Sequence, residues 1–207
     1  MIIFLIIIIL LIIFFVFLDK KLYNPYKLYI LIGNKGTGKT SYMTYLAYKY
    51  AKRGYNVYTN FGIFNQLSTN YWLDDYPPNS VLFVDECGIV HDNRSYKTFP
   101  PECGDFYKYQ RKNKLIVYLS SQTVDIDKKI RDLADYHVLL RRVLPFVFPI
   151  YYKRINKLEK QIDTGGLEII DTLTPVGFTG IKFSHIYCLN LLIKKYDTNY
   201  KIERKKG

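Results

Sequence analysis

A glycine-rich segment between an apolar run and a helical pattern constrains the fold of this 207-residue chain most strongly. It reads Gly33-Asn34-Lys35-Gly36-Thr37-Gly38-Lys39-Thr40 and matches the pattern GxxxxGK(S/T). Glycines in this pattern allow a tight loop whose backbone N–H groups surround phosphates. Residues 28–32 form the apolar run before the loop, and residues 41–52 carry apolar side chains at three- and four-residue steps after it. This order of strand, loop and helix is typical of an α/β P-loop NTPase with a parallel sheet.

The polar residues of the loop have predicted ligands. Lys39 is expected to reach the β- and γ-phosphate oxygens of ATP, and Thr40 to offer its hydroxyl to Mg²⁺. No base-reading motif is evident, so ATP rather than GTP is an inference from the loop alone. A glycine-rich surface turn is the alternative interpretation. The predicted nucleotide-binding residues are Gly33, Asn34, Lys35, Gly36, Thr37, Gly38, Lys39, Thr40 and Ser41.

A second motif supplies the carboxylates of a Walker-type site. Four apolar residues, 81–84, predict a buried strand that delivers Asp85 to the carboxyl edge of the sheet, where α/β sheets bind ligands. Asp85 is expected to hold Mg²⁺ together with Thr40, directly or through water. Glu86 follows at once and is expected to polarise the attacking water. Two strand-end surface carboxylates are the alternative.

Two further strand ends carry candidate catalytic residues. The strand at 115–119 leads into Gln122, which is expected either to sense the γ-phosphate and position water or to cap a loop. The strand at 136–140 leads into two arginines. A P-loop ATPase commonly uses an extra arginine, the arginine finger, to stabilise the negative charge of the transition state. For each arginine considered for this role, the alternative is a solvated side chain or one that contacts lipid. The candidates for this arginine finger are Arg94, Arg131, Arg141 and Arg142.

The N-terminus carries seventeen consecutive Ile, Leu, Phe and Val residues, Ile2 to Leu18. As a helix they would cover roughly 26 Å, close to a hydrocarbon core. We therefore predict one transmembrane helix at 1–20, with a cleaved signal peptide or a buried helix as alternatives. Lys20 and Lys21 follow the run, so the positive-inside rule places the N-terminus outside and the remaining chain in the cytoplasm.

The order of the motifs resembles the zonula occludens toxin family, which includes morphogenesis ATPases of filamentous phages. The segments that carry the resemblance are the P-loop, Val84-Asp85-Glu86-Cys87-Gly88, Asn93-Arg94-Ser95, Leu119-Ser120-Ser121-Gln122 and Arg141-Arg142. The similarity covers about 27–148. It implies a cytoplasmic ATPase head on a membrane span that drives virion assembly and export. This chain places its span before the ATPase, whereas the family usually places it after.

The excess of basic residues indicates the kind of partner that the chain binds and helps to define its C-terminal part. Thirty Lys and Arg against 18 Asp and Glu give a net charge of +12, which favours an anionic partner. We predict a P-loop core at 21–143 and a small, basic, β-rich extension at 144–207. Tyrosines among its cations are compatible with single-stranded DNA contact, membrane lipid contact or a plain solvated surface.

The leading hypothesis is a single-pass, Mg²⁺-dependent ATPase of the host cytoplasmic membrane that drives filamentous phage assembly. An arginine finger from a neighbour predicts a homo-oligomeric ring, and phage coat or other assembly proteins are the expected partners. A nucleotide-gated membrane scaffold without appreciable turnover is one alternative. A DNA-translocating ATPase of conjugative or packaging type is the other.

Overall fold

The computed structural model describes residues 24–90, 100–122, 126–143, 145–160, 167–177, 179–181 and 185–188, with six more residues between 4 and 14. Most of the predicted membrane span at 1–20, Arg94 and the basic residues beyond 188 lie outside the described residues. Among the residues that are described, no helix is long and apolar enough to cross a membrane.

Nine strands form one mostly parallel sheet in the described part of the chain. Their order is β3-β2-β4-β5-β1-β6-β7-β8, and β9 pairs with β7. Neighbours from β3 to β6 run parallel, whereas β7 pairs antiparallel with β6, β8 and β9. The strands are β1 (Leu28–Ile32), β2 (Asn56–Thr59), β3 (Asn65–Gln66), β4 (Ser80–Val84), β5 (Leu115–Ser121), β6 (Tyr136–Val143), β7 (Phe146–Lys160), β8 (Leu167–Pro175) and β9 (Tyr187–Cys188).

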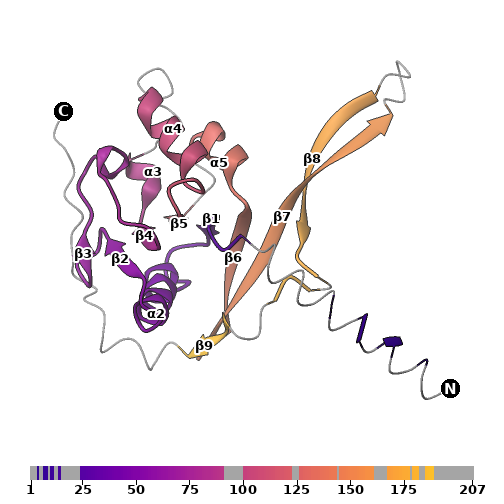
Figure 1. Cartoon of the computed structure of the whole chain (residues 1–207), viewed down its shortest axis with the longest axis horizontal. Helices are drawn as coiled ribbons and strands as arrows, with labels where there is room; N and C mark the ends of the chain where they lie inside the picture. Colours follow the sequence, from indigo (N-terminus) through magenta and orange to yellow (C-terminus); the bar gives the residue numbers. More distant parts are fainter. Residues whose placement is uncertain are drawn as a thin grey trace.

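Helices cover both faces of the parallel part of the sheet, with α2 on one side and α3, α4 and α5 on the other (Figure 1). The helices are α2 (Lys39–Ala51), α3 (Cys87–Val90), α4 (Pro101–Tyr109), α5 (Lys128–Leu133) and the short 3₁₀ helix η1 (Tyr71–Leu73). The α/β class with a parallel sheet, predicted from the sequence, is therefore confirmed. Its strands at 28–32, 81–84, 115–119 and 136–140 lie within β1, β4, β5 and β6.

The face under α2 is built from aromatic side chains. Phe83, Tyr118, Tyr29 and Tyr136 lie side by side on β4, β5, β1 and β6, with successive ring centroids 5.0, 4.4 and 5.4 Å apart. Large aromatic side chains bury much apolar area, and their hydroxyls need partners when buried. The Tyr118 hydroxyl has one, since it lies 3.0 Å from the hydroxyl of Tyr50 on α2. Many of the chain's tyrosines therefore belong to the core.

The opposite face is more aliphatic. Leu28 and Ile30 of β1, with Leu82 of β4, pack there with residues of α4 and α5. Because successive side chains of a strand alternate between faces, Tyr29 and Leu31 lie under α2 while Leu28 and Ile30 lie under α4 and α5. Strands buried on both faces explain the continuous apolar runs of the sequence.

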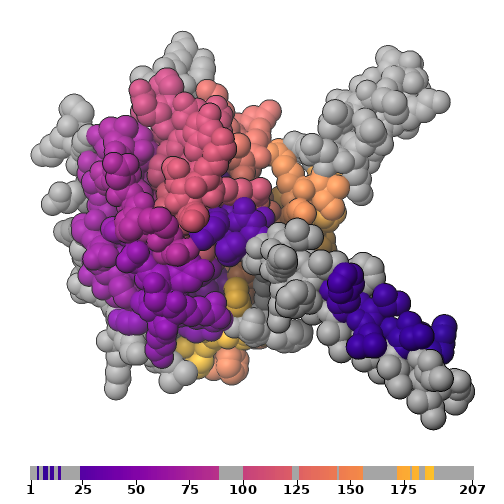
Figure 2. Space-filling model, viewed as in Figure 1, coloured from indigo at the N-terminus to yellow at the C-terminus, as the bar shows by residue number. Residues whose placement is uncertain are grey.

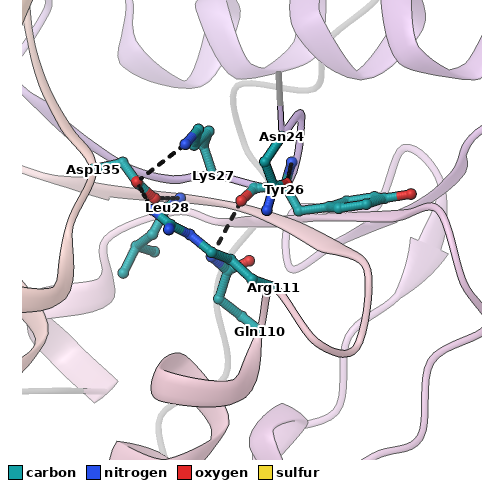
Figure 3. Close-up of polar contacts among 7 residues, drawn as sticks. All are labelled: Asn24, Tyr26, Lys27, Leu28, Gln110, Arg111 and Asp135. Carbon is teal, nitrogen blue, oxygen red and sulfur yellow. Dashed lines mark hydrogen bonds and ion pairs between the residues drawn. The ribbon is translucent and has the colours of Figure 1, made fainter. Parts of the chain in front are cut away.

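Polar contacts fix the start of β1, where the chain enters the sheet (Figure 3). Asp135, directly before β6, accepts a hydrogen bond from the backbone N–H of Leu28 at 2.9 Å. The same carboxylate forms ion pairs with Lys27, at 3.6 Å, and with Arg111. Nearby, the Gln110 side chain donates to the Tyr26 carbonyl at 3.5 Å. These contacts connect β1 to the β5 and β6 sides before the P-loop begins.

The strands after β6 continue the sheet. Register pairs from His137↔Tyr152 to Val143↔Phe146 join β6 to β7, so the predicted domain boundary at 143/144 falls at the turn between two paired strands. The β7–β8 hairpin then extends away from the body (Figure 1). In Figure 2 its orange residues lie beside the coral region of α5 and β6.

Candidate nucleotide-binding site

The P-loop connects β1 to α2. Gly38 caps the helix with φ 89°, and Gly36 has φ 82°, left-handed conformations that side chains other than glycine adopt at a cost. The Thr37 hydroxyl donates to the Asn34 carbonyl at 2.8 Å and closes the loop on itself. A Cβ atom at Gly33 would lie 2.7 Å from that hydroxyl, which explains why glycine begins the motif.

Lys39 folds back over the loop. Its Nζ donates to the Gly33 carbonyl at 2.7 Å and to the Asn34 carbonyl at 3.3 Å, and only 8% of the residue is exposed. Burial lowers the pKa of Lys39, while the negative charges of Asp85 and Glu86 oppose that shift. The ammonium is therefore held where it faces both carboxylates of the second motif.

Thr40 and Asp85 meet although 45 residues separate them. The Thr40 hydroxyl donates to Asp85 Oδ2 at 2.5 Å. A hydroxyl and a carboxylate oxygen are ligands that Mg²⁺ accepts in phosphoryl-transfer sites. The donor set fits the predicted ion, which these two residues would hold directly or through water.

Strand order explains the remaining contacts of Asp85. Because β5 lies between β1 and β4, Ser120 at the end of β5 reaches the carboxylate and donates to Asp85 Oδ1. The backbone N–H of Glu86 donates to the same oxygen at 3.0 Å and to the Ser120 hydroxyl at 3.2 Å. Asp85 is thus oriented by three donors on three segments.

Asn60 holds the backbone of Asp85 and was missed by the sequence analysis. Its side chain donates to the Asp85 carbonyl at 2.9 Å and accepts from the Asp85 N–H at 2.8 Å. Asn60 directly follows β2, as Asp85 follows β4. The rule that singled out Asp85, a polar residue after a buried strand, applies less clearly to Asn60, because only two of the four residues of β2 are buried.

Glu86 and Gln122 come together as a pair. Gln122 Nε2 donates to Glu86 Oε1 at 3.0 Å, so Gln122 orients the carboxylate predicted to polarise water. Glu86 has φ 49°, an uncommon conformation for a residue with a side chain, and such outliers cluster at functional sites.

The candidate arginines occupy different places. Arg142 Nη1 donates to the Gly36 carbonyl of the P-loop at 3.1 Å. Arg141 is exposed on β6 and has no hydrogen bond to the P-loop among the described contacts. Arg131 lies on α5, against the sheet face opposite α2. Arg94 lies outside the described residues.

The C-terminal part of the chain also reaches the P-loop. Tyr187 of β9 donates its hydroxyl to the Gly38 carbonyl at 2.8 Å, and its ring stacks on Tyr42 and Tyr45 of α2. Burial raises the pKa of Tyr187 further above neutral pH, where a tyrosine hydroxyl is already protonated and can donate. No sequence signal marks this contact, since it joins residues 149 positions apart.

The structure therefore brings Lys39, Thr40, Asp85, Glu86 and Gln122 to one edge of the sheet. Their catalytic roles, and the choice of finger among the arginines, stay predictions. The arrangement can bind a phosphate chain, hold a divalent cation and orient a general base.

Comparison with known proteins supports the resemblance found in the sequence. Residues 62–163 match the family model described as zonular occludens toxin, a range that includes Asp85, Glu86 and Gln122 and begins after the P-loop. No curated protein matches the chain.

Similar solved structures share low sequence identity with this chain. The N-terminal domain of zonular occludens toxin from Neisseria meningitidis is 16% identical with a TM-score of 0.48, over 72% of this chain and 94% of that one. The genome packaging NTPase of Sulfolobus turreted icosahedral virus 2, in complex with ATPγS, is 14% identical with a TM-score of 0.48, over 71% and 98%. The flagellar accessory protein FlaH from Methanocaldococcus jannaschii is 13% identical with a TM-score of 0.44, over 74% and 94%.

Proposed function

We propose that this chain, which carries a zonular occludens toxin domain at residues 62–163, is a Mg²⁺-dependent ATPase that drives assembly and export of a filamentous virion at the host cytoplasmic membrane. The contact of Thr40 with Asp85 at 2.5 Å carries the ATPase part of this proposal. This contact joins the P-loop to the carboxylate that follows β4, and a Mg²⁺–nucleotide site requires a hydroxyl and a carboxylate close together.

Binding would use the loop and its lysine. Backbone N–H groups around Gly36 and Gly38 would surround the phosphates, and the Lys39 ammonium would contact the β- and γ-phosphate oxygens. Mg²⁺ held by Thr40 and Asp85 would neutralise negative charge on the same oxygens. Lys39 is already held at the loop by two carbonyls, so little side-chain entropy remains to be lost on binding.

Hydrolysis would use Glu86. Its carboxylate accepts a hydrogen bond from Gln122 at 3.0 Å, and a second acceptor site of the carboxylate can orient a water for attack on the γ-phosphate. Among the finger candidates that the structure describes, Arg142 donates a hydrogen bond to the Gly36 carbonyl of the loop, so it would serve a transition-state role from within the same chain.

Membrane attachment, the subunit ring and the coupling to virion export rest on the N-terminal apolar run and the family domain. The basic surface would serve membrane lipid or single-stranded DNA, and phage coat or other assembly proteins would be the cargo. Virion yield from cells carrying Lys39→Ala tests the coupling. We expect no virions, and an intact yield would contradict it.

Phosphate release by the full-length protein in lipid, with ATP and Mg²⁺, tests the enzymatic part. Glu86→Gln should lower turnover by about 10²- to 10⁴-fold while nucleotide binding persists. Glu102→Gln, an exposed carboxylate change in the first turn of α4, is the matched control and should leave turnover unchanged. Equal turnover in Glu86→Gln and the parent would contradict the assignment of the base.

Two other outcomes would redirect the proposal. Tight nucleotide binding without turnover by the parent would favour a nucleotide-gated scaffold. Turnover that rises severalfold when single-stranded DNA is added would favour direct handling of the genome by a translocating ATPase.

A further inference from the structure

A second concentration of positive charge lies on the sheet face opposite α2, between α5 and the β7–β8 hairpin. A cavity of about 290 Å³ opens there, called the α5–β7 pocket below. It is lined by Lys128, Arg131, Asp132, His137, Arg154 and Leu173, among others. His137 lies opposite Ile30 in the sheet, and Ile30 packs with the α4 and α5 layer. The pocket is therefore on the other side of the sheet from the P-loop helix.

Two buried nitrogens in this pocket have no hydrogen-bond partner among the described residues. They are Arg131 Nε and His137 Nδ1, and His137 as a whole is only 8% exposed. Buried polar groups are nearly always hydrogen-bonded, because an unmade bond leaves the cost of their desolvation uncompensated. Because Arg131 and His137 both line the cavity, a ligand with acceptor oxygens that enters it can supply the missing partners.

The charged side chains around the cavity favour a negatively charged ligand. Lys128, Arg131 and Arg154 supply three cations, whereas Asp132 supplies one carboxylate, which is engaged by Arg154 Nη1 at 2.5 Å. Burial lowers the pKa of His137, and the charges of Arg154 and Arg131 lower it further against a smaller opposing effect of Asp132. Positive charge therefore predominates around the imidazole, and a bound anion would reduce that excess.

The chemistry of the donors narrows the class of anion. A guanidinium presents planar N–H donors whose geometry matches phosphate, and an ammonium adds a compact charge. A cavity of about 290 Å³ lies at the lower limit of small-molecule pockets, room for one phosphate group with a short substituent. We propose that the α5–β7 pocket is a binding site for a single phosphate group, separate from the nucleotide site. Arg131 and His137 are its buried donors.

Histidine NMR on the full-length chain in non-ionic, phosphate-free detergent tests this site locally. The chain has three histidines, His91, His137 and His185, and the loss of one signal in His137→Gln identifies that of His137. Inorganic phosphate should move the His137 signal and raise the pKa of His137 by about one pH unit, since a nearby anion favours the charged imidazole. The same shift should occur in Lys39→Ala, which separates it from phosphate bound at the P-loop.

Adjacent lysines provide a matched pair of variants. Lys128 lines the pocket and Lys129 does not, although both are exposed on α5. Lys128→Gln should weaken phosphate binding by about threefold, Lys129→Gln should leave it unchanged, and Arg131→Gln should abolish the response. Equal weakening by the two lysine variants, or a His137 signal unmoved by tens of millimolar phosphate, would overturn the proposal.

Phosphate esters then identify the source of the group. Glycerol 3-phosphate represents a lipid headgroup, and a short oligothymidylate represents a nucleic-acid backbone. Tighter binding of either ester than of inorganic phosphate supports the site and names its ligand. The proposal does not depend on ATP hydrolysis, so an inactive Glu86→Gln variant should bind phosphate here as the parent does.

Discussion

The P-loop edge and the α5–β7 pocket both gather charged side chains against the same sheet, yet they are built differently. At the P-loop edge, Lys39 lies on two carbonyls and Asp85 accepts from Thr40, Ser120 and the Glu86 N–H. In the α5–β7 pocket, three cations face one carboxylate, and two buried nitrogens have no hydrogen-bond partner among the described residues.

The two sites differ in how their side chains are held before a ligand arrives. A connected hydrogen-bond network fixes its members in place, which suits a site that must orient an ion and a water. The cations of the pocket outnumber its one carboxylate, so they repel one another and gain from any anion that enters. The first site is therefore preorganised for chemistry, and the second is organised for capture of an anion.

The largest expected effect is the loss of Lys39. Lys39→Ala removes the cation predicted to contact the phosphate oxygens, and ATP turnover should fall by about 100-fold or more. Lys52→Ala, at an exposed residue directly after α2, removes the same charge outside the loop and should change turnover little. Phosphate release measures both variants, and a Lys39→Ala enzyme as active as Lys52→Ala would contradict the predicted role of Lys39.

A smaller effect is expected for the loss of Asn60, which holds the backbone of Asp85. Asn60→Ala leaves the N–H and the carbonyl of Asp85 without their side-chain partner and should lower the free energy of unfolding by about 1–3 kcal/mol. Asn56→Ala changes the exposed first residue of β2, the strand that Asn60 follows, and should stay within about 0.5 kcal/mol of the parent. Chemical denaturation of the three proteins measures the difference, and equal stabilities would remove Asn60 from the site.

The smallest effect concerns pH and the pocket. Because the pKa of folded His137 lies below its ordinary value of 6.5, the unfolded chain binds more protons as pH falls through 6.5. His137 therefore contributes a loss of stability on going from pH 7.5 to pH 5.5. His137→Gln should lose less stability over that range than the parent, and added phosphate should narrow the gap. A larger loss in the variant would contradict the sign of the shift.

Much of the nucleotide site could be predicted from the sequence because its signals are local. The P-loop spacing places Lys39 and Thr40 on consecutive residues, and an apolar strand followed by Asp85 and Glu86 marks the sheet edge. Parallel strands bring such ends together, which is how Gln122 also comes to lie at the site.

The rest could not be predicted because it depends on distant pairings. Tyr187 meets Gly38 only through the antiparallel pairing of β9 with β7, and Arg142 rather than Arg141 reaches the loop because alternate residues of β6 face opposite sides. The α5–β7 pocket likewise needs α5, β6 and the hairpin placed together, and Arg131 was expected only as a finger candidate.

Binding of a non-hydrolysable ATP analogue, measured by calorimetry with and without Mg²⁺, tests the central claim most directly. In the parent, Mg²⁺ should tighten binding, and Asp85→Asn should lower that Mg²⁺-dependent gain by about 10- to 100-fold, while the exposed control Asp75→Asn keeps it. The same Mg²⁺ effect in Asp85→Asn as in the parent would contradict the account that Thr40 and Asp85 form the metal site.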